Sequence, residues 1–388
     1  MRAIMHFHLR RLVVCSSLVV LFTLPRQLSA DDAFQPMFNG EDLSGWVLTN
    51  TPSETWSFQD DMLVCTGAPI GELRTEKMYQ NFVMELEWRH MAPRGNAGIF
   101  VWADDITARG VPFHRGVEVQ VLENAYGNSK GHTTHGDIFP IHGATMTPIN
   151  GRGGSRAFPT ENRSRPSPEW NHYRIECRDG EISLAVNGKV VTRGKDCLPR
   201  KGYICLESEG GIVHYRNVRI SELPSTDLTA QQIAIANRGY RSLYTGLNLN
   251  GWKAAGTGSH WESKNWVLAF HGSNEVSGTL RSTESFKNVG FVVDVRLKDK
   301  SSRTSINAGP TMTIDLNAPE IAKHLETVGR WNRIESGVRS GKRWLTINGN
   351  QIAMTAAVTS DSAAAFSLMP TGPVDFCNIY ARSLNVDE

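Results

Sequence analysis

The sequence predicts an all-β protein built from two tandem β-sandwiches. Short segments in which apolar and polar residues alternate are broken by Gly, Asn, Asp and Pro; examples are "NFVMELEWR", "GIFVW", "GVEVQVL" and "EISLAVNG". Alternation with period two is typical of half-buried strands, and many short strands at this spacing are typical of sandwiches. Several stretches also occur twice, which indicates two domains of one fold.

The internal repeat consists of two pairs of matching stretches. "FNGEDLSGW" (38–46) returns as "YTGLNLNGW" (244–252), and "EWNHYRIECRDGEISLAVNG" (169–188) returns as "RWNRIESGVRSGKRWLTING" (330–349). The Asp-Gly and Asn-Gly pairs inside these stretches predict hairpin turns. Tryptophans that recur in both copies indicate packing of the fold rather than ligand binding.

The N-terminus predicts a secretory signal peptide. Three arginines precede the apolar run at 12–24, and "LSA" (28–30) offers small residues for cleavage. An uncleaved anchor is the alternative, but the run is shorter than the ~20 apolar residues that span a bilayer. We expect residues 1–30 to be removed, giving a secreted or periplasmic protein with no stable membrane insertion.

The rest of the chain divides into three parts. We expect a catalytic-type sandwich over 31–223, a linker with a short helix over 224–240, and a shorter, degenerate sandwich over 241–388. The linker prediction rests on Pro224 and on the Ser, Thr and Asp residues that precede an Ala- and Gln-containing segment.

Charge and cysteine content narrow the classes of partner. Without residues 1–30, which hold four Arg and no acidic residue, 37 basic and 39 acidic residues remain, a net charge of −2. This balance gives no electrostatic footprint for nucleic acid. Five cysteines remain, an odd number, so at least one is unpaired within the chain. Cys197 and Cys205 are a candidate disulfide pair by proximity in sequence, although the sequence does not settle the pairing.

Five motifs also occur in an order that resembles a known family. They are "FNGEDLSGW", "GNAGIFVW", "GVEVQVLEN", "PEWNHYRIECRDGEISLAVNGKVV" and "GIVHYRNVRISEL". Together they resemble the 3-keto-disaccharide hydrolase domain family over residues 34–223, and the second copy keeps only the first, penultimate and last motifs. The resemblance implies concanavalin A-like jelly-roll sandwiches, export, and action on glycosides oxidised to a ketone at C3.

The stretch "GVEVQVLEN" (116–124) holds the strongest candidate for chemistry. Its valines predict a core face, so Glu118 and Gln120 point to the opposite face, roughly 7 Å apart along the strand. Conventional glycosidases need two carboxylates, one on each side of the glycosidic bond. Because Gln120 cannot fill the second role, two-carboxylate hydrolysis is disfavoured unless another segment supplies the partner acid.

A 3-keto sugar needs only one carboxylate. The ketone acidifies the C2 proton and places the C1 leaving group β to the carbonyl, so a base and a stabiliser of the enolate oxygen are enough for elimination, with water adding afterwards. Glu118 is the predicted base and Gln120 a positioning residue. Glu123 is the next candidate if a bulge redirects it, and it is expected to bind substrate. The alternative is that these side chains only solvate an exposed sheet face.

The long insert at 125–168 is expected to take part in function. It contains metal-ligating and proton-transferring residues, namely His132, His135, Asp137 and His142. The sequence predicts a divalent metal site formed by Glu118, His135 and Asp137, or a proton shuttle through His135, with Asp137 and His142 near the substrate. The spacing matches no standard zinc pattern.

Aromatic and amide residues are expected to bind sugar. Trp102 shares a face with Asn96 by alternation, and it becomes a stacking platform if that face is the concave one; a core tryptophan is the alternative.

The second copy acts as an internal control. One register aligns its "NAG" (307–309) with that of the first copy and deletes the Glu118 strand. Another register aligns "GPTMTIDLN" (309–317) with the Glu118 strand and puts Thr311 and Thr313 at the positions of Glu118 and Gln120.

Three functions follow from these observations. The favoured one is cleavage of 3-keto-glycosides by elimination and hydration, or by direct hydrolysis, with oxidised carbohydrate as substrate. A non-catalytic carbohydrate-binding protein is the second. An extracellular assembly protein, in which an unpaired cysteine joins chains into a homo-oligomer, is the third.

Overall fold

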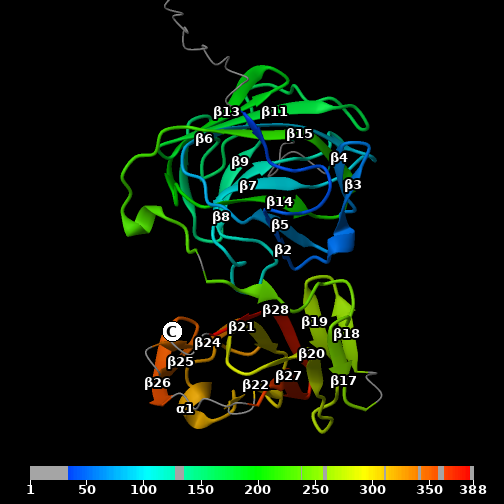
Figure 1. Ribbon diagram of the computed structural model, residues 1–388, viewed down its shortest axis with the longest axis vertical. Coiled ribbons are helices and arrows are strands. Elements are labelled where there is room, and N and C mark those ends of the chain that lie inside the picture. The colour runs from blue at the N-terminus through cyan, green and yellow to red at the C-terminus, as the bar shows by residue number, and fades with distance from the viewer. Residues whose placement is uncertain are drawn as a thin grey trace, which may run out of the picture. The chain divides into compact units, whose positions relative to one another are not determined.

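The computed structural model describes residues 34–126, 135–236, 238–256, 260–309, 312–339, 342–356 and 362–384. The predicted signal peptide (1–30) and His132 lie outside these residues. In the described ranges, no helix has the length and apolar character needed to cross a membrane. The described chain forms four antiparallel sheets (Figure 1), so the predicted all-β class is confirmed.

The first sandwich consists of a nine-stranded and a six-stranded sheet. The nine-stranded sheet has the order β10-β13-β12-β11-β6-β15-β4-β3, with β1 paired to β15; its strands are β1 (Gln35–Pro36), β3 (Trp56–Gln59), β4 (Met62–Cys65), β6 (Phe82–His90), β10 (Thr145–Pro148), β11 (Asn171–Arg178), β12 (Glu181–Val186), β13 (Lys189–Leu198) and β15 (Val213–Glu222). The six-stranded sheet has the order β2-β5-β14-β7-β8-β9; its strands are β2 (Trp46–Thr49), β5 (Gly71–Thr75), β7 (Gly98–Ala103), β8 (Gly116–Gln120), β9 (Ile138–Ile141) and β14 (Tyr203–Ser208).

The second sandwich has an eight-stranded and a five-stranded sheet. The eight-stranded sheet has the order β18-β19-β28-β21-β24-β25-β26, with β16 paired to β28; its strands are β16 (Arg241–Ser242), β18 (Trp261–Lys264), β19 (Val267–Phe270), β21 (Val289–Leu297), β24 (Asn332–Arg339), β25 (Lys342–Ile347), β26 (Asn350–Ala356) and β28 (Val374–Ser383). The five-stranded sheet has the order β17-β20-β27-β22-β23; its strands are β17 (Trp252–Ala254), β20 (Leu280–Phe286), β22 (Arg303–Ala308), β23 (Thr313–Asp315) and β27 (Ala364–Thr371). A short helix, α1 (Pro319–Ala322), follows β23.

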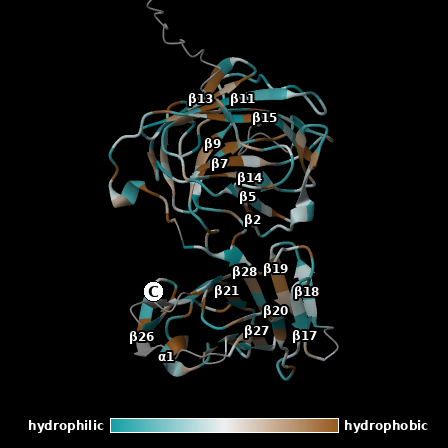
Figure 2. Cartoon of the chain, viewed as in Figure 1, coloured by the Kyte–Doolittle hydropathy of each residue, from teal (hydrophilic) through white to brown (hydrophobic). Residues whose placement is uncertain are grey.

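The alternating pattern forms the cores of both sandwiches. Val117, Val119 and Val121 are fully buried in the first core, where they join residues of the opposite sheet such as Trp88 and Tyr173. Figure 2 shows hydrophobic residues, in brown, along strands such as β7 and β19. Burial of such side chains stabilises the fold by roughly 1.5–3 kcal/mol each before the entropy cost of ordering them.

The predicted hairpin turns are confirmed by the backbone. Asp179 and Gly180 join β11 to β12 with φ of 52° and 85°, and Asn187 and Gly188 join β12 to β13 with φ of 46° and 86°. Two consecutive positive φ values are the signature of a type I′ turn, which Asp-Gly and Asn-Gly pairs favour.

The five described cysteines are all buried and free. The candidate pair of Cys197 and Cys205 is therefore wrong. Cys197 lies in β13 of the nine-stranded sheet, whereas Cys205 lies in β14 of the six-stranded sheet on the face away from the main core. The burial also removes the support for an assembly protein joined through an unpaired thiol.

The segment between the sandwiches contains one short 3-10 turn, η3 (Ala230–Gln232). Thr229 and Gln232 form a reciprocal capping box at its start. This arrangement satisfies two backbone N–H groups of the turn, as the Thr-containing sequence predicts.

The second copy resolves the question of register. Strand β22 occupies the position of β7 in the sheet order, and β23 occupies the position of β8. The motif "NAG" (307–309) therefore lies at the end of β22, whereas in the first copy it lies at the start of β7. The register that deletes the Glu118 strand is therefore wrong. Ile314 of β23 is buried in the second core, and Thr313 and Asp315 are exposed beside it. The carboxylate of Asp315 accepts hydrogen bonds from the backbone and side-chain N–H groups of Asn317 and so caps a local turn.

Candidate functional site

The site lies on the face of the six-stranded sheet that points away from the main core. Glu118 and Gln120 occupy this face of β8, opposite the buried valines, and are 7% and 5% exposed. Their predicted orientation is confirmed. Their burial shows that they do not simply solvate an open surface.

Three further glutamates, which the sequence analysis missed, accompany Glu118. Glu72 of β5 and Glu207 of β14 are direct cross-strand partners, and Glu209 follows β14 and hydrogen bonds with Glu207. In both strands the neighbouring leucines enter the main core, which turns the carboxylates to the opposite face. The alternation of apolar and acidic residues in "YICLESEG" could have indicated that these glutamates share a face, but the pairing of β14 with β5 is not visible in sequence.

Glu118 and Glu207 converge over Gly98 of β7. A Cβ atom added at Gly98 would lie 2.8 Å from Glu118 Oε1 and 2.9 Å from Glu207 Oε2, so a side chain there would displace both carboxylates. The two oxygens are consequently less than about 6 Å apart, a range that includes the ~5–5.5 Å between the carboxyl groups of retaining glycosidases. The absence of a side chain at Gly98 thus creates the space between two acids.

Burial shifts the pKa values of Glu118 and Glu207. Desolvation raises the pKa of Glu118 well above its usual value, the charge of Glu209 raises it further, and Arg156 opposes the shift. The pKa of Glu207 is raised by desolvation and then by the charge of Glu118. Two carboxylates this close do not both ionise readily, so the pair holds a proton near neutral pH.

Replacing Glu209 by glutamine should stabilise the protein more at pH 8 than at pH 5. Burial raises the pKa of Glu209 to about 7 from 4.5, so in this range the folded protein keeps a proton that the unfolded chain releases. Stability therefore falls as the pH rises from 4.5 to 7, by about 1–3 kcal/mol. The glutamine variant lacks this loss. Its Tm minus that of the wild type should grow by several degrees between the two pH values in thermal unfolding.

The comparison with the wild type removes the contribution of titrating groups that Glu209 does not influence. Burial lowers the pKa of His135 to about 4, so this group makes stability rise with pH between about 4 and 6.5. His135 has this effect equally in the wild type and in the glutamine variant, so its contribution cancels in the difference between their Tm values. A Tm difference that stays constant with pH would contradict the raised pKa of Glu209.

Two amide side chains form a hydrogen-bonded chain that ends at Glu209. Gln120 Nε2 donates to Asn96 Oδ1 at 2.9 Å, and Asn96 Nδ2 donates to Glu209 Oε2. Asn96 therefore lies beside the acids, where the sequence analysis expected it. These hydrogen bonds fix the orientation of both amides.

One cation from the long insert reaches the site. Arg156 Nη1 lies 3.0 Å from Asp137 Oδ2, and the guanidinium covers the ring of Phe139 at 3.4 Å from its centroid. Asp137 is fully buried, and Arg156 is close enough to Glu118 to lower its pKa. The guanidinium of Arg156 is thus a positive charge that is fixed in position near Glu118, the predicted base.

The predicted metal site does not form. Among the described residues, Glu118, His135 and Asp137 are not a group whose donor atoms lie within 4.8 Å of one another. Gly136, at φ 91°, turns the chain between His135 and Asp137, and His135 Nδ1 instead lies 2.6 Å from Ser164 Oγ. No described contact joins His135 to Glu118, so the structure does not support the predicted proton shuttle.

Glu123 has a structural role. It is 4% exposed, and its carboxylate accepts backbone N–H bonds from Arg94, Ala125 and Ser167 at 2.8, 2.7 and 3.1 Å. These bonds use both carboxylate oxygens to hold three chain segments together. The prediction that Glu123 binds substrate is wrong for this reason.

Trp102 is a core residue, and its prediction as a stacking platform is wrong. It is fully buried in the main core, and its Nε1 donates to Gln80 O at 2.8 Å. The pairing of β7 with β14 shifts register near Trp102, whose φ is 55°. This bulge breaks the alternation and turns the indole inward.

His142 lies away from the acids, in the exposed turn after β9. Its ring stacks on Phe113 with a centroid distance of 6.5 Å. Phe113 in turn packs on Phe100, which is the cross-strand partner of Glu118. The structure therefore places His142 at the edge of the site, separated from Glu118 by two aromatic rings.

Two described cavities lie on the other sheet. Volumes of about 470 and 630 Å³ occur on the outer face of the nine-stranded sheet, both lined by Glu87 and His172. Trp170 in the larger cavity lies between Arg89 and Arg216, which cover its ring at 4.5 and 4.1 Å. The ring of Trp170 is therefore already in contact with two guanidinium groups.

Sequence comparison relates the first sandwich to a known family: residues 33–221 match the model of the 3-keto-alpha-glucoside-1,2-lyase-like domain family. The resemblance seen in the motifs is confirmed for these residues. The match does not extend to the second sandwich.

Comparisons of structure find sandwiches of low sequence identity. Two proposed glycosyl hydrolases of Parabacteroides distasonis share 22% and 24% identity, with TM-scores of 0.40 and 0.38; they cover 50% and 49% of this chain and 95% and 99% of their own. A Bacillus subtilis protein of unknown function with a galectin-like fold shares 13% identity over 49% of this chain and 94% of its own, with a TM-score of 0.38. Comparison with curated proteins found no significant match.

Proposed function

We propose that the first sandwich, in an exported protein, cleaves 3-keto-glycosides at C1 by elimination followed by hydration. The supporting observation is the convergence of buried Glu118 and Glu207 over Gly98, with Arg156 beside them. Such a pair provides a base and an acid at one place.

The chemistry assigns one role to each acid. Glu118, as carboxylate, takes the C2 proton that the C3 ketone acidifies, and a raised pKa makes it a stronger base. The C1–O bond then breaks, a C1–C2 double bond forms, and the leaving oxygen takes a proton from Glu207, the protonated partner. Addition of water across the double bond restores the 3-keto sugar. Each proton removed is thereby returned.

The remaining residues of the site orient and stabilise. Negative charge develops on the ketone oxygen as the C2 proton leaves, and the guanidinium of Arg156 is the nearest held cation to stabilise it. Gln120 and Asn96, already bonded to each other, present amides for sugar hydroxyls.

Ordinary retaining hydrolysis is a second candidate. The oxygens of Glu118 and Glu207 are less than about 6 Å apart, which suits a nucleophile and an acid on either side of a glycosidic bond. Glu207 is the partner acid that the sequence analysis did not find. This reaction requires no ketone, so the substrate distinguishes the two candidates.

The test compares aglycone release from a chromogenic 3-keto-glucoside and from its unoxidised parent, with the full-length wild-type protein. We expect release from the keto form alone, because only the ketone acidifies the C2 proton. Release from both would favour retaining hydrolysis. Binding of either sugar without release would favour a non-catalytic carbohydrate-binding protein and overturn the proposal.

A further inference from the structure

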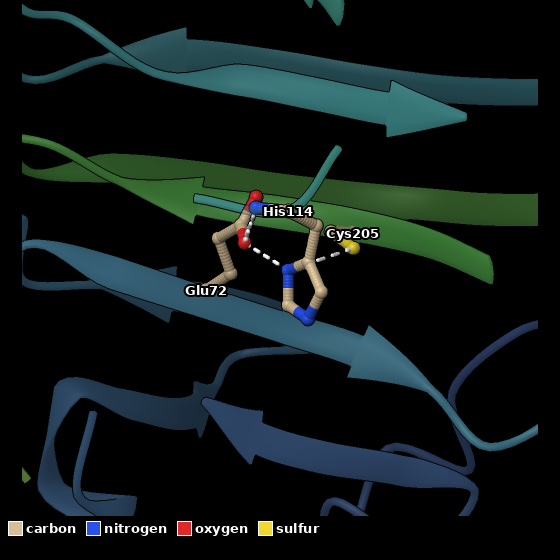
Figure 3. A group of neighbouring side chains, drawn as sticks. All are labelled: Glu72, His114 and Cys205. Carbon is tan, nitrogen blue, oxygen red and sulfur yellow. Dashed lines mark hydrogen bonds and ion pairs between the residues drawn. The ribbon is translucent and has the colours of Figure 1, made fainter. Parts of the chain in front are cut away.

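A second cluster of ionisable groups lies on the same sheet face, beside the acids. Glu72 comes from β5, Cys205 from β14, and His114 from the connection between β7 and β8 at 104–115; their side chains converge in Figure 3. The side chains of Glu72 and His114 are fully buried, as is Cys205. One donor atom from each lies within 4.8 Å of the other two.

We propose that Glu72, His114 and Cys205 bind a zinc ion that fastens the 104–115 connection to strands β5 and β14. This site is separate from the proposed glycoside cleavage and does not depend on it.

The donor set and its spacing fit zinc. Thiolate, imidazole and carboxylate are the three ligand types that zinc takes in proteins, with bonds of about 2.0–2.3 Å. His114 Nδ1 and Cys205 Sγ are 3.7 Å apart, which is about the separation of two ligands on one tetrahedral ion with such bonds. His114 Nδ1 also contacts Glu72 Oε2. The ion takes the place of the proton between these two atoms, and the thiol releases its own proton on binding.

A buried atom without a partner supports a further metal contact. Within the part of the chain that the structure describes, Glu72 Oε1 is buried and accepts no hydrogen bond. Its other oxygen receives the backbone N–H of His114 at 3.0 Å. A zinc ion at the cluster gives the second oxygen a partner, which a buried carboxylate requires.

The charge of the face favours a cation at this position. Glu72 faces Glu207 across the strands, and its charge raises the pKa of both Glu118 and Glu207. The nearby Arg74 donates to Thr75 O and covers the ring of Tyr203 at 4.1 Å. A dication beside Glu72 offsets the carboxylate charge of this face. All three ligand residues are buried, so the cluster is shielded from solvent.

The test measures metal in the full-length protein after incubation with zinc and extensive dialysis. We expect about one zinc per chain in the wild type and less than about a tenth in Cys205→Ser, because the thiolate is the strongest ligand of the three. Cys197→Ser, which removes a buried thiol from the other sheet, should keep its zinc. Chelation should lower the Tm of the wild type and leave that of Cys205→Ser unchanged.

Cobalt gives a readout that does not depend on a variant. Wild-type protein loaded with cobalt should show a thiolate-to-cobalt charge-transfer band and the intense visible bands of tetrahedral coordination. Absence of zinc after dialysis, or a cobalt spectrum without the thiolate band, would overturn the proposal and leave a buried Glu72–His114 ion pair. Activity on 3-keto-glucoside is not part of this test, so the two proposals fail independently.

Discussion

Replacing Glu118 by glutamine should lower kcat for aglycone release from a 3-keto-glucoside by a factor of about 10²–10⁴, which is the usual contribution of a general base. Glutamine keeps the shape of the side chain but cannot take the C2 proton. Because the carboxylate is buried and its pKa is raised, the substitution removes an unfavourable charge and should not destabilise the fold at neutral pH. The measurement is steady-state release, accompanied by thermal unfolding of the same preparation.

The matched control for this variant is Glu181→Gln. Glu181 is an exposed residue at the start of β12, on the other sheet, and its replacement should leave kcat unchanged. If Glu118→Gln keeps wild-type activity while folded, Glu118 is not the base. Loss of activity in Glu207→Gln alone would then assign proton abstraction to Glu207.

Replacing Trp102 by alanine should lower the free energy of unfolding by about 3–5 kcal/mol, as for other large residues deleted from a core. The indole is fully buried, and the variant leaves both a cavity and the Gln80 carbonyl without its donor. In a domain of this size the loss corresponds to a fall in Tm of roughly 6–20 °C. Urea or thermal unfolding of the full-length protein measures it.

Trp170→Ala is the comparison for this second variant. Trp170 is only partly buried and packs between two arginines on the outer face of the nine-stranded sheet, so its loss should cost much less stability. A Trp102→Ala variant with wild-type stability and weakened sugar binding would contradict the core position and restore the stacking role.

The difference between Glu118 and Trp102 shows what the sequence can predict. Strict alternation in β8 was enough to orient Glu118 and Gln120, because three valines on one face fix the register of the strand. In β7 the same reasoning failed at Trp102. A bulge adds one residue to the strand, and nothing in "GIFVW" signals it, since it depends on pairing with β14.

The other acids were missed for a related reason. Glu72 and Glu207 are 135 positions apart and meet only because β5 and β14 are neighbours in the sheet. Arg156 comes from an irregular insert whose path has no periodicity to interpret. Local pattern therefore predicted the fold and one strand of the site, whereas Glu207 needed the strand order and Arg156 needed the path of the insert.

The buried thiols have a consequence for how the chain reaches its native state. With all five described cysteines free, no disulfide must form, so folding needs neither an oxidant nor an isomerase for these residues. Burial raises the pKa of Cys65 to about 11, and a thiol with so little thiolate reacts slowly with oxidants once the fold is complete. Material made in a reducing cytosol and material made in an oxidising compartment should therefore have the same covalent structure at these positions.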